Sequence, residues 1–148
     1  MKYTCAKFSH STKQISICDS QIDAIICSDN NVRFVFSKGF FVCSGDTHTM
    51  CSCGFVELSN CDADEFDCHI VHREPTPVGA RLVGTPISLI ELASILEHEE
   101  RRIEVFLELY DFNYLYWRGT LLPHSAQGLS DNVVIEISGC FPMSFGWK

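Results

Sequence analysis

The 148-residue sequence lacks any long apolar segment. No stretch without Asp, Glu, Lys or Arg exceeds the twelve residues from Gly119 to Ser130. A helix that crosses a bilayer needs about twenty apolar residues, so we expect no membrane partner. The N-terminus also lacks the apolar centre of a secretory signal peptide. These absences together predict a cytoplasmic protein.

Clusters of Lys and Arg are absent as well, and 11 basic residues stand against 19 acidic ones, giving a net charge of -8. Nucleic-acid binding depends on basic side chains that neutralise phosphates, so the composition argues against a nucleic-acid partner. A basic protein surface or a cation suits this charge better. Solubility alone also explains an acidic surface.

The common catalytic motifs are missing. The sequence contains no Walker motif, no dinucleotide-binding glycine pattern, no His-Glu-x-x-His and no Gly-x-Ser-x-Gly. The acidic segment from Asp62 resembles a calcium loop only superficially, because its sixth position is Asp67 where a glycine is required. We therefore predict no catalytic residues and no cofactor, and favour a protein that is not an enzyme.

Nine cysteines are present. This share is below the roughly 8–10% typical of disulfide scaffolds, and we interpret most of these cysteines as small core residues. A zinc site is the alternative, because thiolates and imidazoles are preferred zinc ligands. Its candidate ligands lie in segment 48–72: His48, Cys51, Cys53, Cys61 and Cys68, with His69 and His72 nearby.

Two features argue against that zinc site. Cys51 and Cys53 are separated by one residue, whereas a zinc knuckle uses two. Cys68 and His69 are adjacent, so in a strand their side chains point to opposite faces. Zinc binding therefore remains an alternative hypothesis.

Length and an apolar fraction of 46% predict one globular domain over residues 1–148. The pattern predicts an α+β fold, with about seven to nine mainly antiparallel strands in one curved or two packed sheets. Segments 22–27, 32–36 and 40–43 predict two successive hairpins. The proline-containing segment 74–77 is expected to end any strand, and the apolar tail 141–147 is expected to dock.

One helix is predicted near residues 88–98. Ser88 and Glu91 have the spacing of a capping box, and Leu89, Leu92 and Leu96 follow the helical period. A start at Thr85 with proline at the first helical position is the competing interpretation. Ile90 and Ile95 widen the apolar stripe, so we expect the helix to be well covered.

The strongest strand pattern runs from Ile103 to Leu121, interrupted by a predicted three-residue loop at 111–113. This loop places Tyr110 opposite Tyr114 and Ile103 opposite Leu121. One face of the pair is then continuously apolar, and a shift by one residue would break that agreement.

In this register the other face of the pair combines aromatic rings with a few charges, as protein interfaces do. Its members are Glu104, Phe106, Glu108, Tyr110, Tyr114, Tyr116 and Arg118. The alternative is that a second sheet or the C-terminal tail covers them.

We therefore predict a non-enzymatic protein-binding module that neutralises a basic partner. In size and charge, though in no motif, the chain resembles bacterial immunity proteins that neutralise toxins. Besides zinc binding, a small-molecule carrier built as a closed β-barrel is a further alternative.

Overall fold

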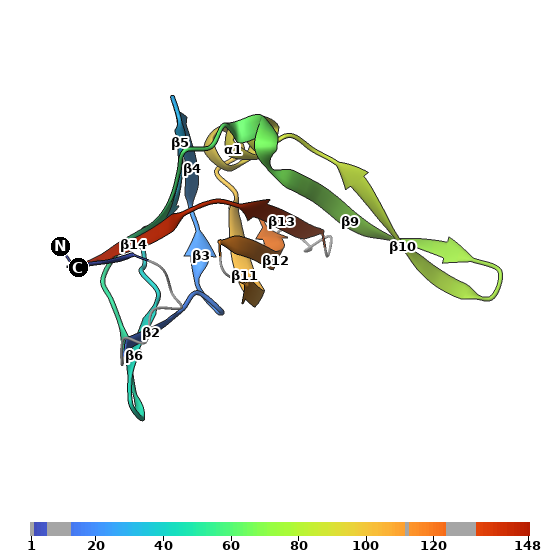
Figure 1. Ribbon diagram of the computed structural model, residues 1–148. Helices are drawn as coiled ribbons and strands as arrows, with labels where there is room; N and C mark the ends of the chain where they lie inside the picture. Colours follow the sequence, from blue (N-terminus) through green and yellow to red (C-terminus); the bar gives the residue numbers. More distant parts are fainter. Residues whose placement is uncertain (1, 6–12, 112, 124–132) are drawn as a thin grey trace.

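The computed structural model describes residues 2–5, 13–111, 113–123 and 133–148. Every strand pairing among them is antiparallel and one α-helix is present, so the predicted α+β class is confirmed. The elements, labelled in Figure 1 where there is room, are β1 (Lys2–Cys5), β2 (Lys13–Ser16), β3 (Gln21–Ile22), β4 (Ala24–Ser28), β5 (Asn31–Phe36), β6 (Phe41–Ser44), β7 (Thr47–Met50), β8 (Gly54–Ser59), the 3₁₀ helix η1 (Ala63–Glu65), β9 (Asp67–Thr76), β10 (Gly79–Pro86), α1 (Leu89–His98), β11 (Arg102–Asp111), β12 (Tyr114–Leu122), β13 (Val134–Cys140) and β14 (Met143–Trp147).

These strands form three sheets. A five-stranded sheet has the order β1-β14-β8-β5-β4, a six-stranded sheet the order β10-β9-β13-β12-β11-β3, and a small sheet the order β2-β6-β7. The predicted numbers of strands and sheets were therefore too low. Two of the missed strands, β7 and β10, have almost entirely exposed side chains, so their sequences show no alternation of apolar and polar residues.

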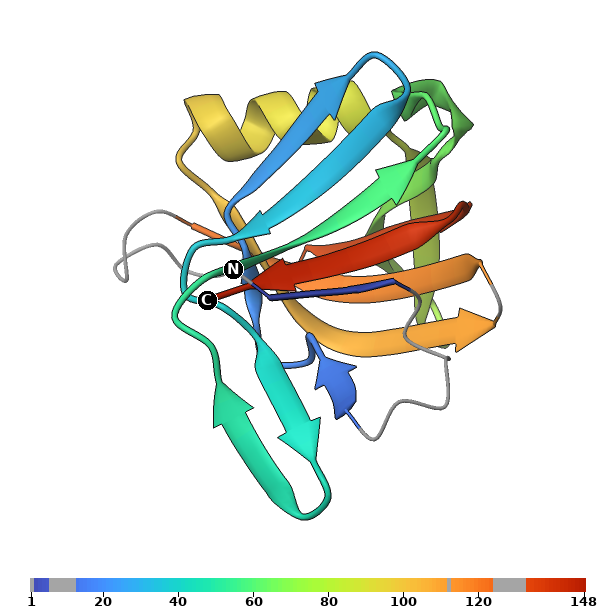
Figure 2. The ribbon, with the colours of Figure 1, turned by 60° about the vertical axis from the view of Figure 1, so that its left-hand side comes forward.

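The two larger sheets face each other, and their facing side chains form the core (Figures 1 and 2). Phe34 of β5 and Trp117 of β12 meet edge to face, with ring centroids 4.9 Å apart. Figure 1 shows α1 at one end of the space between the sheets. The chain passes between the two larger sheets from β3 to β4, from β8 to β9 and from β13 to β14.

The helix begins as the capping box predicts. The Ser88 hydroxyl accepts a hydrogen bond from the Glu91 amide at 3.1 Å, and the Glu91 carboxylate accepts one from the Ser88 amide at 2.9 Å. The competing start at Thr85 is wrong, because Thr85 belongs to β10. Ile90 is 62% exposed, so the helix is covered on one side only. No helix among the described residues has both the length and the apolar character that crossing a bilayer demands.

The first predicted hairpin is confirmed and the second is wrong. β4 and β5 pair with each other, but β5 then pairs with β8, while β6 pairs with β2 and β7. Gly39 explains the departure, because it has a φ of +78° and a Cβ there would overlap the Cys51 carbonyl oxygen. The chain turns sharply at this glycine and leaves the larger sheet.

The C-terminal tail docks as predicted. Its strand β14 lies between β1 and β8 in the five-stranded sheet, and Phe145 is fully buried. The tail is therefore part of the five-stranded sheet, and it packs against the inner side of the six-stranded one.

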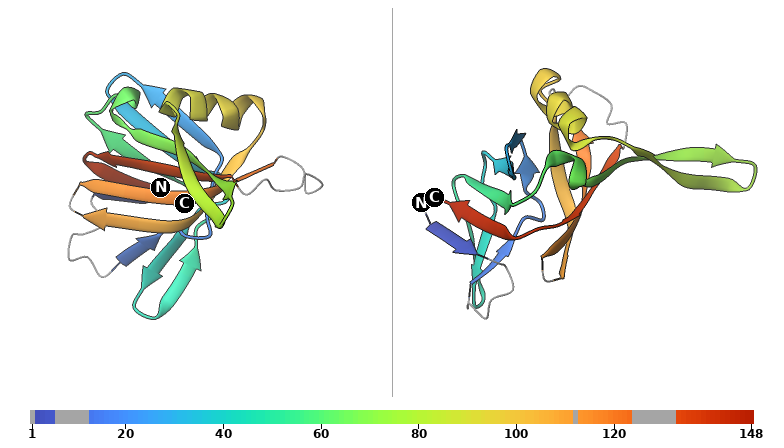
Figure 3. Two further views of the ribbon diagram at one scale, coloured as in Figure 1. Left: turned by 90° about the vertical axis from the view of Figure 1, so that its right-hand side faces the viewer. Right: turned by 45° about the horizontal axis from the view of Figure 1, so that its top comes forward.

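The β9–β10 hairpin extends away from the body of the molecule (Figures 1 and 3). Among the residues that the structure describes, β13 pairs with β9 only as far as Val71, and beyond it β9 pairs with β10 alone. Pro75 lies inside β9, so the prediction that segment 74–77 ends the strand is wrong. An edge strand tolerates a residue without a backbone N–H, and at Pro75 β9 has neighbours on one side only.

Candidate binding surface

A β-bulge at Phe106 divides the β11–β12 pair into two registers. Ile103 lies opposite Leu121, as predicted, but the register shifts between Val105 and Leu107. From there to the loop the prediction is wrong by one residue. Tyr110 lies opposite Leu115, and Asp111 opposite Tyr114; Phe112 of the predicted loop is outside the described residues.

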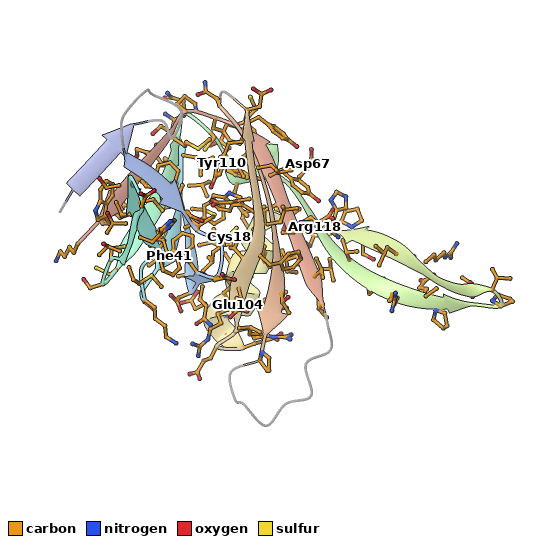
Figure 4. The ribbon with its side chains drawn as sticks, turned by 90° about the horizontal axis from the view of Figure 1, so that it is seen from below. Cys18, Phe41, Asp67, Glu104, Tyr110 and Arg118 are labelled. Atoms are coloured by element: carbon orange, nitrogen blue, oxygen red, sulfur yellow. The ribbon has the colours of Figure 1, made fainter. Side chains whose placement is uncertain are left out.

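Because of this one extra residue, each side chain of β11 after the bulge points to the face of the sheet opposite to the predicted one. Glu108 and Tyr110, predicted on the exposed face, turn toward the interior of the molecule. Leu107 and Leu109, predicted in the core, turn outward, and Leu109 is 53% exposed. Figure 4 shows Tyr110 and Arg118 on opposite sides of the sheet.

Gly119 lies opposite Val105, immediately beside the bulge. A Cβ there would clash with the Ile103 side chain and come within 2.8 Å of the Glu104 carbonyl oxygen. We expect Gly119→Ala to lower the free energy of unfolding by about 1–3 kcal/mol, because the two strands must move apart. Urea unfolding measures the change.

Gly84→Ala is the matched control for this substitution. Its nearest neighbour, on His69, lies at an ordinary contact distance of 3.7 Å, so the expected change is within about 0.5 kcal/mol. Equal losses of stability in the two variants would show that Gly119 does not fix the close approach of the strands.

Exposed apolar side chains gather on the outer face of β11 and β12, the face turned away from the five-stranded sheet. Leu109, Phe106 and Tyr114 are 53%, 47% and 42% exposed, respectively. We call this set the outer face; it consists of Glu104, Phe106, Leu107, Leu109, Tyr114, Tyr116 and Arg118. Five of its seven members are those that the sequence predicted, and Leu107 and Leu109 replace Glu108 and Tyr110.

A carboxylate from β13 fixes two members of the outer face. The Tyr116 hydroxyl donates a hydrogen bond to Glu136 at 2.9 Å, and the Arg118 Nε lies 3.0 Å from the same carboxylate. Burial, followed by the hydrogen bond and charge of Glu136, raises the pKa of Tyr116. Side chains that are already ordered lose less conformational entropy when a partner binds. Sequence reasoning missed Glu136, because its position beside β12 depends on strand order.

Glu108 and Tyr110 instead attach the β2 segment to the six-stranded sheet. The Glu108 carboxylate accepts hydrogen bonds from the Ser16 hydroxyl at 2.7 Å, the Ile17 amide at 3.2 Å and the Tyr110 hydroxyl at 2.8 Å. The Tyr110 oxygen in turn accepts one from Trp117 Nε1 at 3.0 Å. Burial, and then the Glu108 charge, raises the pKa of Tyr110 well above its ordinary value. This polar cluster is structural.

The zinc candidates lie at separate places. His48 Nδ1 is 3.0 Å from Cys43 across the β6–β7 hairpin, whereas the Cys51 sulfur accepts a hydrogen bond from the Phe40 amide at 3.2 Å. Cys53 is half-buried in the segment before β8. Across the described ranges, no group of three or more His, Cys, Asp and Glu side chains is placed to hold a metal ion.

The two remaining candidates are core thiols. The Cys61 thiol donates to the Leu58 carbonyl at 3.4 Å and is 1% exposed. Cys68 is 3% exposed on the inner side of β9, and burial raises its pKa to about 12. A thiolate, the form that binds zinc, is therefore strongly disfavoured at Cys68.

A groove of about 610 Å³ lies between α1 and the segment from Asp23 to Ile26. Its lining includes Lys38, Glu97 and Arg101. A carrier of small apolar molecules needs an enclosed, mostly apolar cavity, and this open, charged groove is not of that kind. Aromatic side chains such as Phe34 fill the space between the two larger sheets.

In comparisons with known proteins, no protein family, curated protein or solved structure matches the chain.

Proposed function

We propose that this protein is a non-enzymatic binding module that engages a basic protein partner through the outer face. The observation that carries the proposal is the exposure of three large apolar side chains, Phe106, Leu109 and Tyr114, on one face of the six-stranded sheet. Contiguous exposed apolar surface of this kind is typical of interaction sites. Aromatic anchors supply much of the affinity of protein interfaces.

The arrangement of the tail supports an open face. The alternative to a binding surface was that a second sheet or the C-terminal tail covers these rings. The tail instead forms β14 in the opposite sheet, on the far side of Trp117 from the outer face.

The charge supports a basic partner. A net charge of -8 attracts a positively charged protein from a distance and accelerates their encounter. Salt screens this attraction, with a Debye length of about 10 Å at 0.1 M and about 3 Å at 1 M. We therefore expect the association rate constant to fall as salt is raised, while dissociation changes less.

The test begins with identifying a partner and ends with an affinity measurement. A benzophenone amino acid at position 109, in the outer face, captures proteins that contact it in cells, and each captured protein is then purified. We expect the double variant Leu109→Ala, Tyr114→Ala to bind this protein at least about 30-fold more weakly, because each truncation removes an exposed anchor. Calorimetry measures the dissociation constants.

Ile90→Ala is the control, because Ile90 is 62% exposed on α1, outside the outer face, and its loss should leave the affinity unchanged. A correctly folded double variant with full affinity contradicts the proposal. So does the absence of any protein that is cross-linked specifically from position 109.

A further inference from the structure

The arm, residues 72–83 of the β9–β10 hairpin, consists of two strands, and no third strand pairs with it within the described residues (Figures 1 and 3). A two-stranded antiparallel ribbon is at best marginally stable in water, and three or more strands are needed for independent stability. An added strand would therefore stabilise the arm.

The outer edge of β10 is open for such a strand. β10 pairs with β9 on one side, and within the described part of the chain no strand pairs with its other side. Proteins usually protect edges of this length with charged side chains or bulges. Arg81 is the one charged residue of β10, and its guanidinium already bonds Glu74 of β9 at 2.9 and 3.0 Å.

We propose that β10 pairs antiparallel with β10 of a second copy of this chain, which joins two six-stranded sheets across a twofold axis at Leu82. In this register Leu82, 66% exposed, lies opposite its own counterpart. Arg81 lies opposite the second copy's Val83, so no like charges face each other. One strand supplies both sides of the contact, as a twofold interface requires.

Charge favours the arm as the contact between copies. The arm contains two arginines and one glutamate and carries a net charge of +1. The rest of the chain therefore carries -9, since the whole chain carries -8. Two acidic bodies repel each other, and pairing through the arms keeps them apart by an overlap of seven β10 residues, about 23 Å. A basic peptide on this edge would face Arg73 and Arg81, so the arm does not suit the basic partner of the outer face.

A groove at the base of the arm receives the tip of the other arm. Ile70, Pro86, Ile87 and Ile95 contribute to a groove of about 440 Å³ where β10 meets α1. In the register centred on Leu82, Val78 at the tip lies opposite Pro86 of the second copy. Val78 is 98% exposed, and the same contact recurs at the other end by symmetry.

Sedimentation of the full chain under reducing conditions tests the proposal. We expect twice the mass of one chain, with a dissociation constant below about 100 μM. Leu82→Lys places two like charges opposite each other and should weaken the dimer at least tenfold. Ile26→Lys, an equally drastic change at an exposed position on β4, away from the arm, should leave the dimer intact.

Cross-linking tests the register. A benzophenone amino acid at position 78, in a mixture of isotopically light and heavy chains, should form mixed cross-links to residues 86–95. A monomeric wild type, an undiminished Leu82→Lys dimer or cross-links confined to other segments would overturn the proposal. These outcomes are independent of the partner experiment, because neither position belongs to the outer face.

Discussion

Glu108→Ala is expected to lower the free energy of unfolding by about 3 kcal/mol, because three donors lose a carboxylate acceptor at once. These donors are the Ser16 hydroxyl, the Ile17 amide and the Tyr110 hydroxyl. Urea unfolding at neutral pH measures the loss. The half-buried position of Glu108 exposes part of the cluster to water and keeps the expected cost below that of a deeply buried charge.

Glu104→Ala is the matched control on the same strand. Glu104 is also half-buried, but the hydrogen bond it accepts from Gln21, at 3.3 Å, is long, so the expected loss is below about 1 kcal/mol. A double-mutant cycle with Tyr110→Phe adds a second criterion. Since the two side chains share one hydrogen bond, the double variant should lose less than the sum of the single variants. Equal losses at positions 104 and 108 would show that the cluster does not anchor β2.

Stability is expected to decline above pH 9, and Cys68 contributes to this decline together with Cys27, Cys51 and Cys61, whose pKa values burial also raises. In the unfolded chain the Cys68 thiol ionises near the ordinary value of 9.0, whereas the folded protein holds its pKa at about 12. The fold therefore favours the neutral thiol, and this contribution is complete below pH 9 and is lost as pH rises to 12. Each pH unit in this window costs about 1.4 kcal/mol, or about 4 kcal/mol in total.

Cys68→Ala should flatten the pH dependence of stability between pH 9 and pH 11, although it also lowers stability at neutral pH by creating a cavity. The slope is therefore the quantity to compare, in urea unfolding with a reductant present. Cys140→Ala, at an exposed thiol, should leave the slope unchanged. Tyr110, whose pKa is also raised, adds a decline that begins near pH 10 in all three proteins. Identical slopes for wild type and Cys68→Ala would contradict this account.

Local signals in the sequence predicted the helix and several strands correctly. The capping box at Ser88 and Glu91 acts within four residues, so no other part of the chain is needed to interpret it. The same holds for the β4–β5 hairpin, whose strands adjoin a short turn. The partner of β5 on its other side is β8, and no local pattern specifies that contact.

The outer face was predicted in part, for a physical reason. The sequence from Ile103 to Tyr110 fits a continuous strand whichever of its two faces is buried, so the pattern alone does not reveal an inserted residue. The bulge arises where Gly119 lets the strands approach, which is a property of two strands together. The only local hint is the run of three apolar residues from Val105 to Leu107, because strict alternation would place a polar residue at its centre.

The position of β14 has a consequence for the order of folding. Within the part of the chain that the structure describes, β1, near the start of the sequence, pairs only with β14, and β8 has β14 on its second edge. During synthesis the ribosome must therefore deliver residues 143–147 before the five-stranded sheet closes. Pairings between such distant segments slow folding to the millisecond-to-second range typical of β-rich topologies. Until then the nascent chain exposes an unpaired edge on β8. Chaperones can bind such an edge, and in their absence it can pair with another chain and aggregate.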